Sequence, residues 1–127
     1  MHLPLHDATH IIADLNGLSK LAHDCAKAHG FHDDTVTRSV TENYAIWTTN
    51  IHGEVSELWE AARNGTLAQP CDKSPALELT NEEEELADII LRTLDLAAAR
   101  GIKIGQAVIH KYNFNLTRPH KHGNKLA

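Results

Sequence analysis

Two pairs of acidic residues are the part of this sequence best suited to chemistry. Glu54 and Glu57 form one pair, and Glu85 and Asp88 form the other, with the same i,i+3 spacing. On an α-helix this spacing places both carboxylates of a pair on neighbouring turns of one surface strip. If two such helices pack side by side, four carboxylates meet, and their repulsion favours a divalent cation between them. Mg²⁺ suits such a site because it takes oxygen ligands and is commonly shared between carboxylates and substrate phosphates.

The position of each pair around its helix bears on this interpretation, since acidic residues at this spacing are also common on solvated surfaces. At about 100° per residue, Glu54 and Glu57 flank an expected buried side, and Glu85 borders the next one, with Asp88 further round. Glu82 is a candidate accessory ligand, although a first helical turn also attracts acids through the helix dipole. The expected buried sides are Ile51, Val55, Leu58 and Ala62 on one helix and Leu86, Ile89, Ile90, Thr93 and Ala97 on the other.

Basic residues are concentrated at the other end of the chain. The formal net charge is -5, which argues against binding to a nucleic acid polymer, yet residues 101 to 127 contain no Asp or Glu. An acidic middle followed by a basic end suits a small anionic ligand, held by metal on one side and by ammonium or guanidinium groups on the other. The basic residues of this end are Lys103, Lys111, Arg118, Lys121 and Lys125.

Apolar residues recur at steps of three and four, and no run of alternating apolar and polar residues appears. The elements that position the acidic and basic residues are therefore expected to be helices. Thr80 and Glu83 form a predicted capping box, and Gly30, Gly65 and Gly101 are predicted to end helices. The segment 66–79 contains two prolines and is expected to be a loop. The predicted helices cover about 7–29, 35–64, 80–100 and 104–117, the last ending early because Pro119 disfavours helix at Arg118 as well.

The chain of 127 residues is therefore expected to be one all-α domain, a helical bundle with a basic tail over about 119–127. Its core is modest, and a second chain is an expected way to complete it. Two cysteines without zinc-type spacing indicate free thiols, and no signal peptide or membrane-spanning stretch is recognised. We expect a cytosolic protein with no membrane partner.

The last predicted helix carries polar residues in line with apolar ones. Ile104, Ala107, Val108, Lys111 and Asn115 share one face. Either this face opens on a polar cleft, or the lysine stem packs on the core and its ammonium group reaches solvent. The basic tail that follows is either a disordered segment or a lid over phosphate.

Three runs of the chain resemble the MazG-like all-α nucleoside triphosphate pyrophosphohydrolases. They are IHGEVSELWEA at 51–61, EELADIILR at 84–92 and KYNFNLTRPHKHG at 111–123. The resemblance covers most of the chain beyond Asn43, and the combination of ExxE, ExxD and the K-x-x-x-N-x-x-R-P-x-K-H-G ending is specific.

The resemblance implies a four-helix core assembled as a homodimer or homotetramer, and hydrolysis of a (deoxy)nucleoside triphosphate to the monophosphate and pyrophosphate, in control of the nucleotide pool. It implies Mg²⁺, with Mn²⁺ as a substitute, at catalytic metal ligands Glu54, Glu57, Glu85 and Asp88. It also implies triphosphate contacts from Lys111, Asn115, Arg118 and Lys121. The long segment 65–79 departs from the family pattern, so the resemblance does not predict how the entrance to the cleft is formed.

Base recognition is predicted from the residues themselves. Trp47 and Asn50 lie one to two turns before Glu54 on nearly the same strip, so Trp47 could stack on a base and Asn50 could read its edge. A tryptophan at helical spacing is also a common core residue.

Other functions remain open at this point. Within the same fold, the substrate could be dUTP or phosphoribosyl-ATP. A di-iron carboxylate bundle is disfavoured, because no Glu here is followed by His at the third position. A non-catalytic helical interaction module is the remaining alternative, although all four candidate carboxylates are present.

Overall fold

A computed structural model of the chain describes residues 1–126, and its regular elements are α-helices. In that range the only β pairing is an isolated bridge between Pro70 and Thr80. The all-α prediction is confirmed. None of the helices within 1–126 has both the length and the apolar character needed to cross a membrane. The helices are α1 (Thr9–Ala28), α2 (Val40–Arg63), α3 (Asn81–Ala99), α4 (Ile104–Leu116) and the single turn α5 (Lys121–Asn124).

Most helix boundaries follow the local signals in the sequence. The Glu83 backbone N–H donates to Thr80 Oγ1 at 3.2 Å, and the Thr80 N–H donates to Glu83 Oε1 at 3.0 Å, so the predicted capping box is present. Gly30 and Gly101 follow α1 and α3 with φ of 83° and 66°, the left-handed region in which glycine ends a helix without strain. The segment 66–79 is a loop, as expected.

The start of α2 was predicted wrongly. We expected it near Thr35, but α2 begins at Val40, after a second capping box between Ser39 and Glu42. The preceding turn is held in place because the Thr35 carbonyl accepts a hydrogen bond from Asn43 Nδ2 at 2.8 Å. The cap at Ser39 satisfies the first N–H groups of the helix, so nothing favours extending it backwards.

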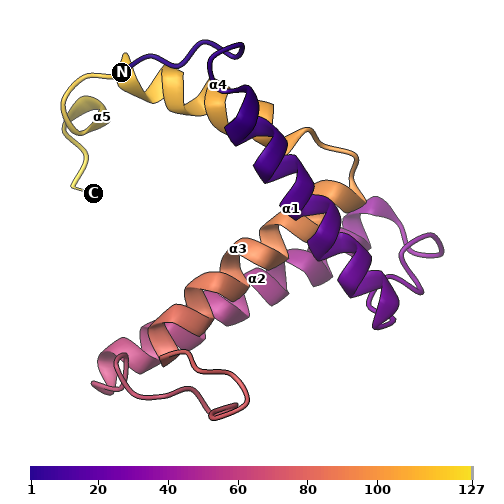
Figure 1. Ribbon diagram of the computed structural model, residues 1–127. Helices are drawn as coiled ribbons and strands as arrows, with labels where there is room; N and C mark the ends of the chain where they lie inside the picture. Colours follow the sequence, from indigo (N-terminus) through magenta and orange to yellow (C-terminus); the bar gives the residue numbers. More distant parts are fainter. Residues whose placement is uncertain (127) are drawn as a thin grey trace.

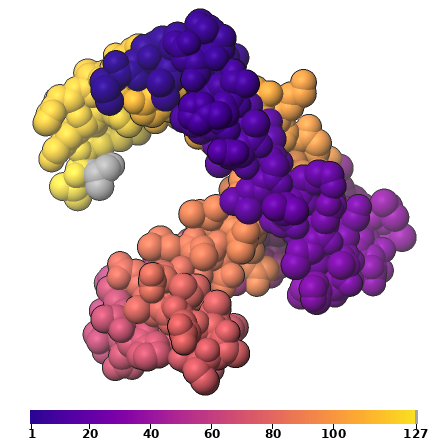
Figure 2. All heavy atoms as spheres, viewed as in Figure 1, coloured from indigo at the N-terminus to yellow at the C-terminus, as the bar shows by residue number. Residues whose placement is uncertain are grey.

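The helices form an open V rather than a closed bundle within one chain (Figure 1). α3 contacts both α2 and α1, and α1 also contacts α4. One arm of the V is the α2–α3 pair, and the other is the α1–α4 pair. A space-filling view shows a hollow between the two arms (Figure 2).

Close backbone contact joins α4 to α1. A Cβ atom at Gly105 would lie 2.5 Å from the carbonyl oxygen of Ile12, so only glycine fits at this crossing. The Gly105 N–H donates to Asn16 Oδ1 at 2.8 Å, and the Asn16 amide donates to Gln106 Oε1 at 3.0 Å. The first residues of the chain also bind α4, because the Asn113 amide pairs with both the N–H and the carbonyl of Leu3, at 2.8 and 2.6 Å.

The buried strips of α2 and α3 differ from the predicted ones. On α2 the buried residues are Asn43, Trp47, Glu54 and Ala61, whereas Val55, expected inside, is 46% exposed. On α3 they are Glu84, Leu94 and Ala97, and the expected core residues Leu86 and Ile90 are 47% and 53% exposed. Of the predicted residues, Ala97 is buried, Ile51, Leu58 and Ile89 are half-buried, and Ala62 and Thr93 are exposed.

The prediction of which face of α4 is buried was also wrong. Gly105 and Ile109 are the buried residues of this helix, and Ile109 is 3% exposed. The expected strip is mostly exposed, since only Ile104 is half-buried and Ala107, Val108, Lys111 and Asn115 face solvent. α2 and α4 each pack mainly on a single helix, whereas every helix of a closed four-helix bundle packs on two, and this leaves apolar strips uncovered in the single chain.

Candidate metal centre and adjoining cavity

Carboxylates from α2 and α3 meet near the middle of the α2–α3 arm. Glu54, Glu85 and Asp88 each place an oxygen within 4.8 Å of the others, a group able to hold a metal ion. Glu54 is 8% exposed, and the other two are half-buried. Both carboxylates of the i,i+3 pair on α3 therefore belong to the same group, and they face Glu54 across the contact between α2 and α3.

Glu54 lies in the buried strip rather than at its border, which corrects the sequence prediction. It is accommodated there because Arg92 Nε donates to Glu54 Oε1 at 2.6 Å. Burial alone would raise the pKa of Glu54, but the hydrogen bond and charge of Arg92 bring it below the ordinary value. This ion pair joins α2 to α3 at the cluster.

Glu85 has the opposite electrostatic situation. Burial, followed by the neighbouring carboxylates of Glu54 and Glu57, raises the pKa of Glu85 from 4.5 to about 8. The pKa of Asp88 is also raised, mainly by burial and then by Glu54 and Glu84. Like charges close together in a partly desolvated site make each further ionisation costly.

The residues of the cluster fit a hard divalent cation. Glu85 Oε2 is buried and has no hydrogen-bond partner, which is uncommon for a buried carboxylate oxygen. A cation beside this oxygen would supply the missing partner and would offset the repulsion between Glu54, Glu85 and Asp88. All the candidate donors here are carboxylate oxygens, the type that Mg²⁺ and Mn²⁺ take.

The remaining predicted acidic residues lie at the edge of this group. Glu57 is exposed, but it is near enough to contribute to the raised pKa of Glu85. Its oxygens are not part of the three-residue group. Glu82 is exposed in the first turn of α3 and is likewise outside the group.

The predicted phosphate contacts lie elsewhere in the single chain. Lys111 and Asn115 are exposed on α4, in the arm opposite the acidic cluster. The Lys111 ammonium lies 4.8 Å from the centre of the Phe114 ring, and the Arg118 guanidinium lies 5.8 Å from it. Lys121 follows at the start of α5 and is exposed. One chain thus places Lys111 and Arg118 around Phe114, in the arm opposite the carboxylates.

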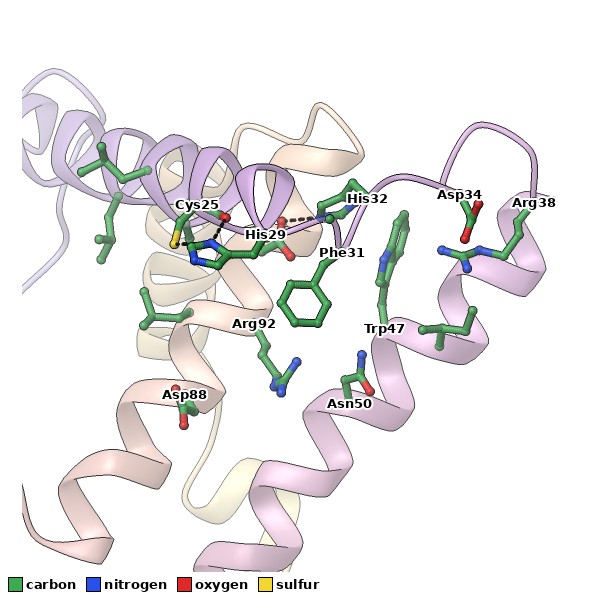
Figure 3. Close-up of a pocket in the computed structure, with 18 residues that line it drawn as sticks. Cys25, His29, Phe31, His32, Asp34, Arg38, Trp47, Asn50, Asp88 and Arg92 are labelled. Carbon is green, nitrogen blue, oxygen red and sulfur yellow. Dashed lines mark hydrogen bonds and ion pairs between the residues drawn. The ribbon is translucent and has the colours of Figure 1, made fainter. Parts of the chain in front are cut away.

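A cavity of about 770 Å³ adjoins the acidic cluster between α1, α2 and α3. Asp88 and Arg92 line one part of it, and Trp47 and Asn50 line another (Figure 3). Trp47 is 9% exposed and packs edge-on against Tyr44, with ring centres 5.5 Å apart. Both predicted base-contacting residues therefore reach the same cavity as a member of the acidic cluster, and Trp47 is also a core residue.

The contacts of two residues in this region were not predicted from the sequence. Arg92 ends the second quoted run, one turn beyond Asp88, and that spacing could have suggested a countercharge. Lys73, in the loop 66–79, forms an ion pair with the buried Glu84, and this contact raises the pKa of Lys73. Nothing local in the sequence indicates that contact, because the loop has no periodicity.

Comparisons with known proteins identify no relative of this chain: no protein-family model, no curated protein and no solved structure matches it.

Proposed function

We propose that this chain is a MazG-like, Mg²⁺-dependent pyrophosphohydrolase that converts a (deoxy)nucleoside triphosphate to the monophosphate and pyrophosphate. The observation that carries the proposal is the partnerless, buried Oε2 of Glu85 beside Glu54 and Asp88. Arg92 balances the charge of Glu54 only, and packing between α2 and α3 alone does not account for the other two carboxylates at their contact. A metal ligand set gives each of them a reason to be there.

Glu54, Glu85 and Asp88 would hold the metal in this proposal. A bound Mg²⁺ ion offsets the charge of phosphoryl oxygens and makes water a better nucleophile. Glu57, which is exposed at the edge of the cluster, would orient a water molecule and accept its proton as general base. Arg92 would keep Glu54 ionised and in place through their hydrogen bond of 2.6 Å.

The adjoining cavity supports a nucleoside-sized substrate. Its volume of about 770 Å³ lies within the usual range of roughly 300–1,000 Å³ for small-molecule sites. Trp47 offers an aromatic ring and Asn50 an amide with both donors and an acceptor, while Asp88 places the acidic cluster at the same cavity. A base in the cavity would leave its phosphates near the carboxylates.

The triphosphate contacts of the proposal come from a neighbouring chain. Lys111, Asn115 and Arg118 lie on the arm of the V opposite the acidic cluster, so they are free to meet the cluster of another copy. Cations placed there would stabilise the charge that develops on the leaving pyrophosphate. The exposed apolar strips of α2 and α3 would form the contact between chains.

Pyrophosphate release from a panel of canonical and modified NTPs and dNTPs tests the proposal. The panel is assayed with Mg²⁺, with Mn²⁺ and with a chelator. We expect metal-dependent release of pyrophosphate and the matching monophosphate from at least one member, and its loss in Asp88→Asn. Release of inorganic phosphate instead would contradict the reaction, and no release by a folded, oligomeric sample would favour the interaction module.

A further inference from the structure

A second group of metal-binding side chains lies outside the acidic cluster. His23 of α1, His32 of the α1–α2 connection and Asp95 of α3 converge, with ligand atoms all within 4.8 Å of one another. His23 Nδ1 and His32 Nε2 each lie 2.8 Å from the same oxygen, Asp95 Oδ1. The two imidazole rings meet edge to face, with centres 4.5 Å apart.

The burial of the group is greater than that of ordinary surface histidines. The His32 side chain is 7% exposed, and those of His23 and Asp95 are each 20% exposed. Three separate segments contribute one donor each, so the group forms only in the folded chain. Two ring nitrogens and a carboxylate oxygen form a donor set that suits Zn²⁺ and similar transition metals rather than Mg²⁺.

Thr35 supports one of these ligands from behind. His32 Nδ1 lies 3.0 Å from Thr35 Oγ1, on the side of the ring opposite Asp95. With a metal bound, Nδ1–H can donate to Thr35 Oγ1 and leave the Nε2 lone pair for the ion, whereas in the metal-free chain Nε2–H can donate to Asp95 Oδ1. Metal-binding histidines are commonly held by such a bond on the second nitrogen, which sets both the tautomer and the ring orientation.

The spacing needs little change to admit an ion. Ligand atoms around a tetrahedral Zn²⁺ lie roughly 3.3 Å apart, given metal–ligand bonds of about 2.0–2.2 Å. The observed separations of 2.8 Å would therefore open by about half an ångström. His32 and Asp95 also line the cavity of about 770 Å³, so a fourth position can be filled by water or by a cavity ligand.

This group is too far from the acidic cluster to complete a two-metal site there. Asp95 follows Asp88 by two helical turns, or about 10 Å along α3, whereas paired catalytic metals lie about 3.5–4 Å apart. We propose that His23, His32 and Asp95 form a separate site for a Zn²⁺-class transition-metal ion. The ion ties the α1–α2 connection to α3 at the end of the cavity away from Asp88. The proposal does not depend on the pyrophosphohydrolase function.

Metal binding by the untagged full chain tests this proposal without any nucleotide. Metal-free protein in excess Mg²⁺ is titrated with Zn²⁺ against a competing chelator, and with Co²⁺ while visible absorption is recorded. The variants are His32→Gln, Asp95→Asn and Thr35→Val, with His10→Gln, an exposed histidine of α1, as the matched control. Glu85→Gln is included to separate this site from the acidic cluster, and circular dichroism confirms that each variant is folded.

We expect one tight Zn²⁺ per chain in the wild type, in His10→Gln and in Glu85→Gln, together with a ligand-field Co²⁺ spectrum. In His32→Gln and Asp95→Asn the affinity should fall by about 100-fold or more, and in Thr35→Val by about 10- to 100-fold. Wild-type affinity in folded His32→Gln and Asp95→Asn would overturn the site. Absence of tight binding by the folded wild type would also overturn it and leave a hydrogen-bonded His–Asp–His network.

Discussion

Glu54 and Glu85 face each other across α2 and α3 but hold their protons with different strength. Arg92 donates to Glu54 and keeps the pKa of this carboxyl below its ordinary value, despite burial. Glu85 has no such partner, and burial with the nearby charge of Glu54 and Glu57 raises its pKa to about 8. The charge of Glu54 is therefore balanced by Arg92, whereas Glu85 needs a proton or a cation to balance its charge.

The raised pKa of Glu85 predicts a pH-dependent stability of the metal-free protein. The folded chain binds this proton more tightly than the unfolded chain. The contribution of Glu85 to the free energy of unfolding is therefore fully present below pH 4.5 and is lost as the pH rises to about 8. Asp88 shifts in the same direction. Thermal melts in a chelator across this window should show a falling Tm, and saturating Mg²⁺ should reduce the fall.

Glu85→Gln should flatten this pH profile, because glutamine does not ionise. Glu82→Gln, an exposed residue in the same helical turn, is the control and should keep the wild-type profile. A profile of Glu85→Gln that matches the wild type would show that Glu85 is not the group that holds the proton.

Glu57 is predicted to act on water rather than on the fold. Because it is exposed at the edge of the cluster, Glu57→Gln should leave Tm nearly unchanged. If it is the general base, kcat for pyrophosphate release should fall by about 10²- to 10⁴-fold. Glu60→Gln, an exposed neighbour on α2, is the matched control. Near-normal kcat in Glu57→Gln would remove Glu57 from the mechanism.

At the scale of elements, α3 holds the molecule together because two other helices pack on it. Its contact with α2 contains the acidic cluster, and its contact with α1 contains the Ser19 hydroxyl, which donates to the Leu94 carbonyl at 2.6 Å. The segment 66–79 is fastened to the start of α3, since the Asn81 N–H donates to the Gln69 carbonyl at 2.9 Å and Lys73 pairs with Glu84. The segment that separates the two acidic pairs in sequence thus folds back onto the helix beside them.

The α1–α4 crossing should be the packing contact most sensitive to a single methyl group. Gly105→Ala places a Cβ atom 2.5 Å from the Ile12 carbonyl oxygen, so α4 must move, at a cost of about 1–3 kcal/mol in the free energy of unfolding. Gly17→Ala in α1, where a Cβ atom meets nothing within 4 Å, should instead stabilise by about 0.5–1 kcal/mol. Urea unfolding of both variants measures the difference, and equal stabilities would contradict the close approach.

The chain exposes more accessible surface than is typical of a stable folded monomer of the same mass. A folded monomer of 14.0 kDa has about 6,700 Å² of accessible surface, whereas this chain has 8914 Å². The excess of roughly 2,200 Å² per chain is comparable to the area that obligate oligomers bury. Val55, Trp59, Leu86 and Ile90 contribute to it on the α2–α3 arm.

We therefore predict that the chain is a homodimer or homotetramer in solution. Leu86→Glu combined with Ile90→Glu should dissociate it, because each charge would have to be buried in the contact between chains. Sedimentation equilibrium measures the mass, with Val36→Glu, a 91% exposed apolar residue outside the helices, as the control. A wild-type monomer that is fully stable would contradict the prediction.

The helices and the carboxylates of the site followed from local signals in the sequence. Capping at Thr80, the glycines that end α1 and α3, and the i,i+3 acidic pairs depend on residues a few positions apart, so they can be recognised without the fold. Three of the four predicted carboxylates, Glu54, Glu85 and Asp88, do meet in space. The roles of these residues and of Lys111, Asn115, Arg118 and Lys121 stay predictions.

Which face of each helix is buried was decided only by the tertiary structure. Hydrophobic periodicity marks every apolar strip of a helix, but it does not say which strip meets its own chain and which is left for another. That choice exposed Leu86 and Ile90, moved Glu54 into the contact with Arg92, and put α4 on α1 through Gly105. His23, His32 and Asp95 are brought together by the crossing of α1 over α3, a contact between residues up to 72 positions apart that no local pattern encodes.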